Sequence, residues 1–236
     1  MPYPDNAELH ELIAAQWEVC KAFDCGIGFH SGSGKSGENY AVMGEVTGGR
    51  LEIKTSGRYT YEMGRALAAS EEDADQALWS DWHAFTVDMA VLGSFSADDT
   101  ERNMARSFVV DALEKEGEAT DVFADPDTLR KALESLEPSP EHMFWFEYNF
   151  LYVLAAEGKA DKASLGDHSP AGYRQRERFY GITPRAKFLY ARHVADYIVF
   201  LAETTGIVPP EVCGRARQRL ASLETLDQLI EDIPHP

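Results

Sequence analysis

The stretch from Cys25 to Gly57 constrains the fold of this chain more than any other. It contains two short apolar runs, 25–29 and 50–53, and each leads into ligand-type or cationic side chains and then into a loop of small residues. In parallel α/β proteins, functional sites are built at the carboxyl ends of the strands. The window therefore predicts two strands whose ends carry a site.

The segments around these two runs have recognisable periodicities. Apolar residues spaced along one face predict a helix that begins at Asp5 or Asn6, before the first run. We predict a further strand over 40–46, separated from the run at 50–53 by a glycine turn, and a helix over 59–69. The order from 26 to 69 is then strand, loop, strand, helix.

Beyond this region the pattern is mostly helical. The aromatic stretch 142–152 lacks alternation and fits either a buried strand or a buried helix. The other segments predicted to be helical are 77–92, 98–116, 126–136, 183–202, 215–220 and 226–230.

These patterns predict one α/β domain over 1–236, with a motif-bearing βα region over 1–70 and a mostly helical region over 71–236. The strands are few for so many helices, so a complete eight-stranded barrel of about 250 residues does not fit. Either the sheet is small, or the chain is one part of a larger α/β unit.

Composition excludes some partners. The net charge of −18 argues against nonspecific nucleic-acid binding, which needs Lys and Arg to neutralise phosphates. The three cysteines form no Cys-x-x-Cys motif and are expected to be reduced thiols of a cytoplasmic protein. Charges interrupt the longest apolar segments, so we expect no membrane span.

The stretch from Cys25 to Gly57 fits two kinds of site chemistry. Gly34, Lys35 and Ser36 follow a strand, as in a phosphate-binding loop, but the first glycine that this motif requires falls on Phe29. Gly28 stands one residue too early, and the segment after Ser36 is a poor helix start.

The second chemistry is metal-assisted. His30 and Glu52 are metal-ligand types near strand ends, and Lys54 lies two residues past Glu52 on the same face. A divalent metal beside a lysine is suited to polarising a substrate carbonyl or hydroxyl while the lysine holds a carboxylate. A histidine in a Gly/Ser loop is also often an ordinary surface residue.

Two segments of the window carry a family resemblance: Phe29-His30-Ser31-Gly32-Ser33-Gly34-Lys35 and Leu51-Glu52-Ile53-Lys54-Thr55-Ser56-Gly57. They resemble the tagaturonate/fructuronate epimerase family, whose members are metal-dependent sugar-acid epimerases on a TIM-type barrel. The resemblance covers 26–67. The sequence departs from the family at Gly34, where the family has aspartate, and at Glu52, where the family has a second histidine.

This resemblance implies an α/β fold like the later portion of a TIM-type (β/α) barrel, with a helix-rich C-terminal half. It also implies a divalent metal ion (Zn, Mn or Ni) bound by His30, with Glu52 as a second ligand. The expected ligand is a keto-sugar acid. The residues implied to contact this substrate are Lys54, Ser31, Ser33 and Lys35.

Two other functions fit the same residues. The chain could be a non-catalytic or truncated relative that acts as a subunit, with a second copy or a partner chain completing the barrel. It could instead be a phosphate- or nucleotide-binding enzyme that uses the loop Gly34-Lys35-Ser36.

Overall fold

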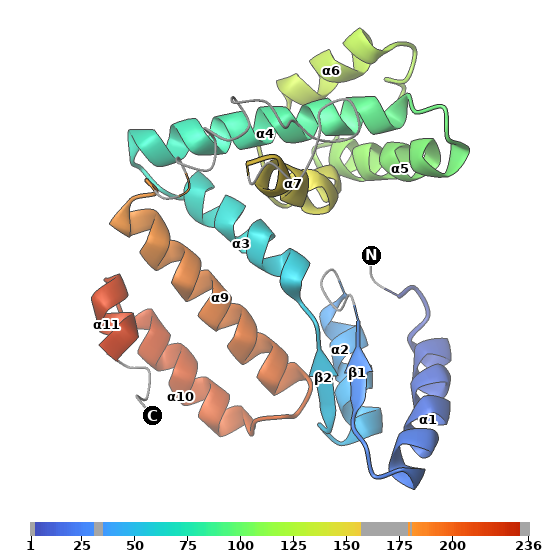
Figure 1. Ribbon diagram of the computed structural model, residues 1–236, viewed down its shortest axis with the longest axis vertical. Helices are drawn as coiled ribbons and strands as arrows, with labels where there is room; N and C mark the ends of the chain where they lie inside the picture. Colours follow the sequence, from blue (N-terminus) through green and yellow to red (C-terminus); the bar gives the residue numbers. More distant parts are fainter. Residues whose placement is uncertain (1–2, 31–34, 157–178, 180, 232–236) are drawn as a thin grey trace. The chain divides into compact units, whose positions relative to one another are not determined.

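Figure 1 shows the computed structural model, which describes residues 3–30, 35–156, 179 and 181–231. The chain divides into two compact units. Unit 1 comprises Met1–Tyr59 with Ala191–Pro236, and unit 2 comprises Thr60–Tyr190. Each is described by itself.

Unit 1 contains a small parallel sheet with a helical crossover. Its first part runs through α1 (Asn6–Ala22), β1 (Ile27–Phe29), α2 (Gly37–Thr47) and β2 (Leu51–Ile53). Residues 191–204 of α9 (Pro184–Thr204), α10 (Pro210–Ala221) and α11 (Leu226–Glu231) belong to the same unit. In the sheet, Ile27 pairs with Leu51 and Phe29 with Ile53.

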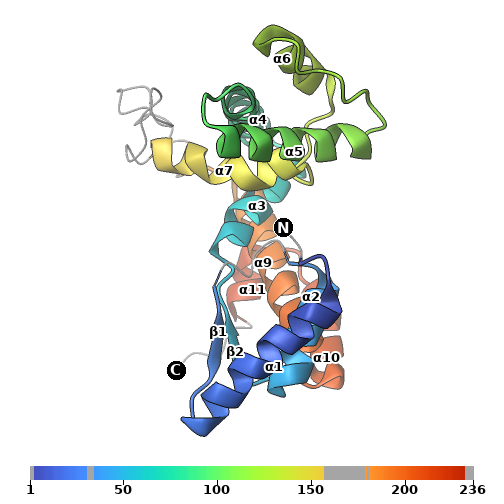
Figure 2. The same ribbon diagram turned by 90° about the vertical axis from the view of Figure 1, so that its right-hand side faces the viewer.

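One face of this sheet forms the core of unit 1. Phe29, Leu51 and Ile53 pack against a buried cluster from α1 and α2, both of which lie on that side of the strands (Figure 2). Successive side chains of a strand point to opposite faces, so Gly28 and Glu52 lie on the other face, where both are exposed. The sheet therefore has an apolar side and a polar side.

The strand predicted over 40–46 is wrong, because this segment is α2. Ser36 caps the helix: its side chain accepts a hydrogen bond from Asn39 N, and the Asn39 side chain accepts one from Ser36 N. Gly48 ends the helix in the left-handed region at φ 60°. The buried residues Tyr40, Met43, Gly44 and Thr47 follow the helical period.

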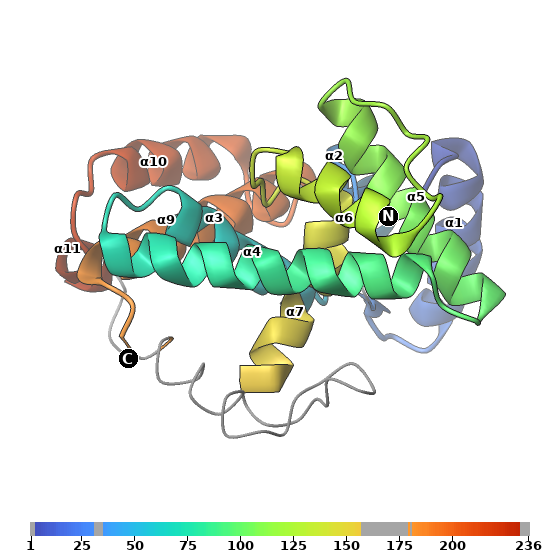
Figure 3. The ribbon, with the colours of Figure 1, turned by 90° about the horizontal axis from the view of Figure 1, so that it is seen from above.

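The regular elements among the described residues of unit 2 are all helices. It contains α4 (Asp73–Ser94), α5 (Asp99–Lys115), α6 (Pro126–Ser135) and α7 (Met143–Ala156), together with residues 60–68 of α3 (Ser56–Ala68). Helix α4 contacts α5, α6 and α7, and it is the long helix that crosses Figure 3. The aromatic stretch is therefore a buried helix.

The core of unit 2 explains that outcome. Trp145 of α7 packs edge-on against Trp79 and Trp82 of α4, with ring centroids 4.5 and 5.0 Å apart. Tyr152, about two turns farther along α7, stacks on Trp82 at 5.5 Å. Because both α4 and α5 pack against α7, its apolar residues are not confined to one narrow stripe, and the sequence shows no clear helical period.

The expected barrel-type α/β fold is wrong. The described residues contain a single unclosed sheet of two three-residue strands, and their other regular elements are helices. A TIM-type barrel has eight strands, tilted and staggered to one another. With the segment 40–46 helical, only the two runs of the original window pair as strands.

Candidate functional site

The candidate site lies at the carboxyl edge of the β1–β2 sheet. The two strands are parallel and paired in register, so they end side by side at Phe29 and Ile53. The backbone N–H of Lys54 donates to the carbonyl oxygen of Phe29 at 3.0 Å, which extends the ladder by one bond. His30 and Lys54, the next residues on each strand, are thereby fixed next to each other.

Their side chains meet. Lys54 Nζ lies 3.1 Å from His30 Nε2, and both side chains are exposed. An ammonium group can only donate hydrogen bonds, so we assign Nε2 as the acceptor and place the ring proton on Nδ1. Two further N–H groups of Lys54 are available for other acceptors.

An open pocket of about 220 Å³ covers this contact. It is lined by Gly28, Phe29, His30, Glu52 and Lys54, so the pocket holds three of the side chains that the sequence singled out. A second open pocket, of about 500 Å³, lies over the amino-terminal part of the same strands and includes Arg50 and Glu52 in its lining. Both pockets are therefore lined by residues of the polar side of the sheet.

The other predicted contact residues lie elsewhere or outside the described chain. Ser31 and Ser33, like Gly34, fall outside the described residues. Lys35 immediately precedes the capping residue of α2 and is not among the residues that line the 220 Å³ pocket. The expectation that the segment after Ser36 is a poor helix start is wrong, since Ser36 and Asn39 form a capping box there.

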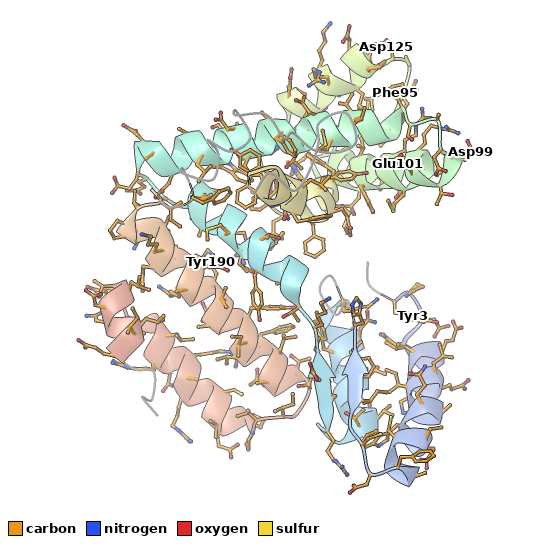
Figure 4. All side chains as sticks on the ribbon, viewed as in Figure 1. Tyr3, Phe95, Asp99, Glu101, Asp125 and Tyr190 are labelled. Atoms are coloured by element: carbon orange, nitrogen blue, oxygen red, sulfur yellow. The ribbon has the colours of Figure 1, made fainter. Side chains whose placement is uncertain are left out.

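Asn39 is a residue that sequence reasoning missed. It is buried, and its side chain accepts from Tyr3 N at 2.8 Å and donates to Asn6 Oδ1 at 2.7 Å. It therefore ties the segment before α1 to the start of α2 (Tyr3 is labelled in Figure 4). The pattern Ser-x-x-Asn at 36–39 resembles a capping box and was the available signal.

The described side chains do not by themselves complete a metal site. Among them, no group of three or more His, Cys, Asp or Glu residues is placed to hold a metal ion. His30 and Glu52 line one pocket, but the Nε2 atom of His30 accepts from the Lys54 ammonium. A cation at that nitrogen would compete with the ammonium and be repelled by it.

Comparison of the chain with known proteins found no relative. No family model, no characterised protein and no solved structure matches the chain. Within the described parts of the chain, no helix combines the length and the apolar character needed to cross a bilayer. Function is therefore inferred from the geometry of the site.

Proposed function

We propose that the carboxyl edge of the β1–β2 sheet binds a keto-sugar acid of the tagaturonate/fructuronate type, and that the chain epimerises it. The contact between Lys54 and His30 inside the 220 Å³ pocket carries this proposal. It supports an anionic ligand because a positioned ammonium makes strong charge-assisted hydrogen bonds to a carboxylate. The resemblance of the two segments supplies the sugar class.

Each side chain of the pocket has a role in this proposal. Lys54 binds the substrate carboxylate, and His30 is a positioning residue that holds the Lys54 ammonium over the pocket. Glu52 is the carboxylate in the pocket lining, and it accepts the proton of the hydroxyl group on the carbon to be inverted, which lies two bonds from the carbonyl. The bond between this carbon and the carbon beside the carbonyl then breaks, which gives an aldehyde and an enolate. The enolate adds to the opposite face of the aldehyde, and Glu52 returns the proton to the new alkoxide, which gives the epimer.

The test compares Lys54→Ala with Lys21→Ala. Lys21 is an exposed lysine of α1 that pairs with Glu18, so its removal is expected to have little effect. Fructuronate binding is measured by calorimetry and its conversion to tagaturonate by NMR, with and without added Mn²⁺, Ni²⁺ or Zn²⁺. We expect Lys54→Ala to weaken binding about 10- to 100-fold, the usual effect of losing a hydrogen bond to a charged group.

The outcome that contradicts the proposal is a folded wild-type protein that neither binds nor converts fructuronate under any of these metal conditions. Equal affinity in Lys54→Ala and wild type would place the ligand elsewhere. Unchanged affinity in Lys21→Ala shows that the loss does not come from the net charge alone.

A second candidate function is phosphate binding. It is favoured by the order β1 then α2, with Lys35 and Ser36 at the start of a capped helix. Against it, the Ser36 hydroxyl already accepts from Asn39 N at 3.2 Å. Lys35→Ala in the same panel separates the two functions. If the chain binds phosphate, magnesium-ATP raises the melting temperature of wild type and not that of Lys35→Ala. If the chain is an epimerase, magnesium-ATP leaves the melting temperature of both unchanged.

A further inference from the structure

The carboxyl end of α1 is a Schellman motif whose paired side-chain positions are both cysteine. Cys25 N donates to Cys20 O at 3.0 Å, and Asp24 N donates to Lys21 O at 3.2 Å. Asp24 takes the left-handed position at φ 50°. In this motif the third residue from the end of the helix lies beside the third residue after the helix, and here, with α1 ending at Ala22, these residues are Cys20 and Cys25.

The Cys25 thiol contacts the backbone of Cys20. Cys25 Sγ donates to Cys20 O at 3.4 Å. Partial burial raises the pKa of the Cys20 thiol, and a hydrogen bond with Cys25 raises this pKa further. Cys25 is exposed, whereas Cys213 of α10 is buried. All three cysteines are reduced in this structure.

We propose that Cys20 and Cys25 are a redox-sensitive dithiol, which a hydroperoxide oxidises to an intramolecular disulfide. The exposed Cys25 thiolate attacks the peroxide, which breaks the O–O bond and gives a sulfenic acid and hydroxide. The sulfur of Cys20 then attacks Cys25 Sγ, and the sulfenic oxygen leaves as water. Overall, the two thiols lose two electrons and two protons, and one hydrogen peroxide becomes two waters.

The backbone is already suited to this bond. A disulfide requires Cα atoms about 4.4–6.8 Å apart, and the bond from Cys25 N to Cys20 O folds the chain back so that these residues are close. Asp24 holds the required left-handed turn, and aspartate tolerates that conformation better than most residues. Oxidation would therefore fix the turn that leads into β1 without unwinding α1.

The experiment is a thiol titration in denaturant after treatment of the folded protein with hydrogen peroxide. In wild type the number of reactive thiols should fall from three to one, and dithiothreitol should restore all three. Cys213→Ser is the matched control and should still lose two thiols. In Cys20→Ser, dimedone should label Cys25 as a sulfenic acid, because the resolving thiol is gone.

Three results would overturn the proposal. They are retention of all three thiols in wild type, disulfide-linked dimers on a non-reducing gel, and a thiol loss that depends on Cys213. Each serine variant replaces one sulfur by oxygen and could lose its fold for that reason. A melting curve therefore identifies any unfolded variant before its titration is interpreted.

Discussion

At the scale of single residues, His83 is a buried base without a hydrogen-bond partner for its Nε2 atom in the described structure. It lies on α4 beside the rings of Trp79 and Phe144, with centroid distances of 5.6 and 6.1 Å. Burial, with a further contribution from the neighbouring His142, lowers the pKa of His83 to about 4. The folded protein therefore keeps this imidazole neutral at pH values where an unfolded chain protonates it.

This difference predicts a pH-dependent stability. An unfolded histidine has a pKa of about 6.5, so between pH 6.5 and 4 the unfolded state binds a proton that the folded state does not. The free energy of unfolding should fall over this range as the pH is lowered, by up to about 3 kcal/mol from this residue. Urea denaturation from pH 7 to pH 4 measures it.

Two variants isolate the contribution of His83. His83→Leu should lose this part of the pH dependence, whereas His10→Leu, on the exposed face of α1, should retain it. Identical pH profiles for wild type and His83→Leu would show that the buried imidazole does not control acid stability.

At the scale of elements, α2 and α9 approach each other through a glycine. A Cβ atom on Gly44 would overlap the carbonyl oxygen of Thr205, which follows the end of α9. Gly214, in the interior of α10, has nothing within 4 Å of the same position. The close contact with Thr205 therefore requires glycine at position 44, whereas position 214 has space for a side chain.

We expect the substitutions Gly44→Ala and Gly214→Ala to have opposite effects. In Gly44→Ala the helices must separate, which should destabilise the protein by about 1–3 kcal/mol. In Gly214→Ala the helix gains a better helix former, which should stabilise it by about 0.5–1 kcal/mol. Midpoints of urea denaturation give both values, and shifts in the same direction would contradict the assignment of the α2–α9 contact.

The sequence predicted elements where local signals were unambiguous. Asp5 caps α1, and Asp125 caps α6 with a proline at the first turn, as expected. The sequence placed His30 near a strand end and Lys54 on the same face as Glu52, but the contact between His30 and Lys54 depends on the register of the two strands, which the sequence did not predict. Helix α2 was missed because its buried face includes Gly44 and Thr47, which carry little hydrophobic signal, and its contact partner lies far along the chain.

At the scale of the whole molecule, each unit has its own hydrophobic core. In unit 1 the core gathers around Leu9, Ile13, Tyr40 and Met43, whereas unit 2 has two larger clusters, one of them rich in tryptophan. The sequence predicted one domain because no linker interrupts it at 59 or 190. These boundaries fall within α3 and α9, which continue through them.

Separate cores predict separate unfolding transitions. In a Trp17→Phe variant, the remaining tryptophans 79, 82 and 145 report on unit 2 by fluorescence. With Cys20 and Cys25 replaced by serine, reactivity of the buried Cys213 reports on unit 1. We expect Cys213 to react at a lower urea concentration than the fluorescence transition, because the core of unit 1 is smaller; coincident curves would indicate a single cooperative unit.

The division of the chain also sets an order of folding during synthesis. Unit 2 is continuous in sequence, but unit 1 joins its first 59 residues to the stretch that begins at Ala191. At roughly 5–20 residues per second, a ribosome needs on the order of ten seconds to make the intervening segment. Throughout that interval the face of α2 that carries Tyr40 and Gly44 lacks its contacts with Tyr197 and Thr205, so we expect the nascent amino-terminal half to expose apolar surface that chaperones bind.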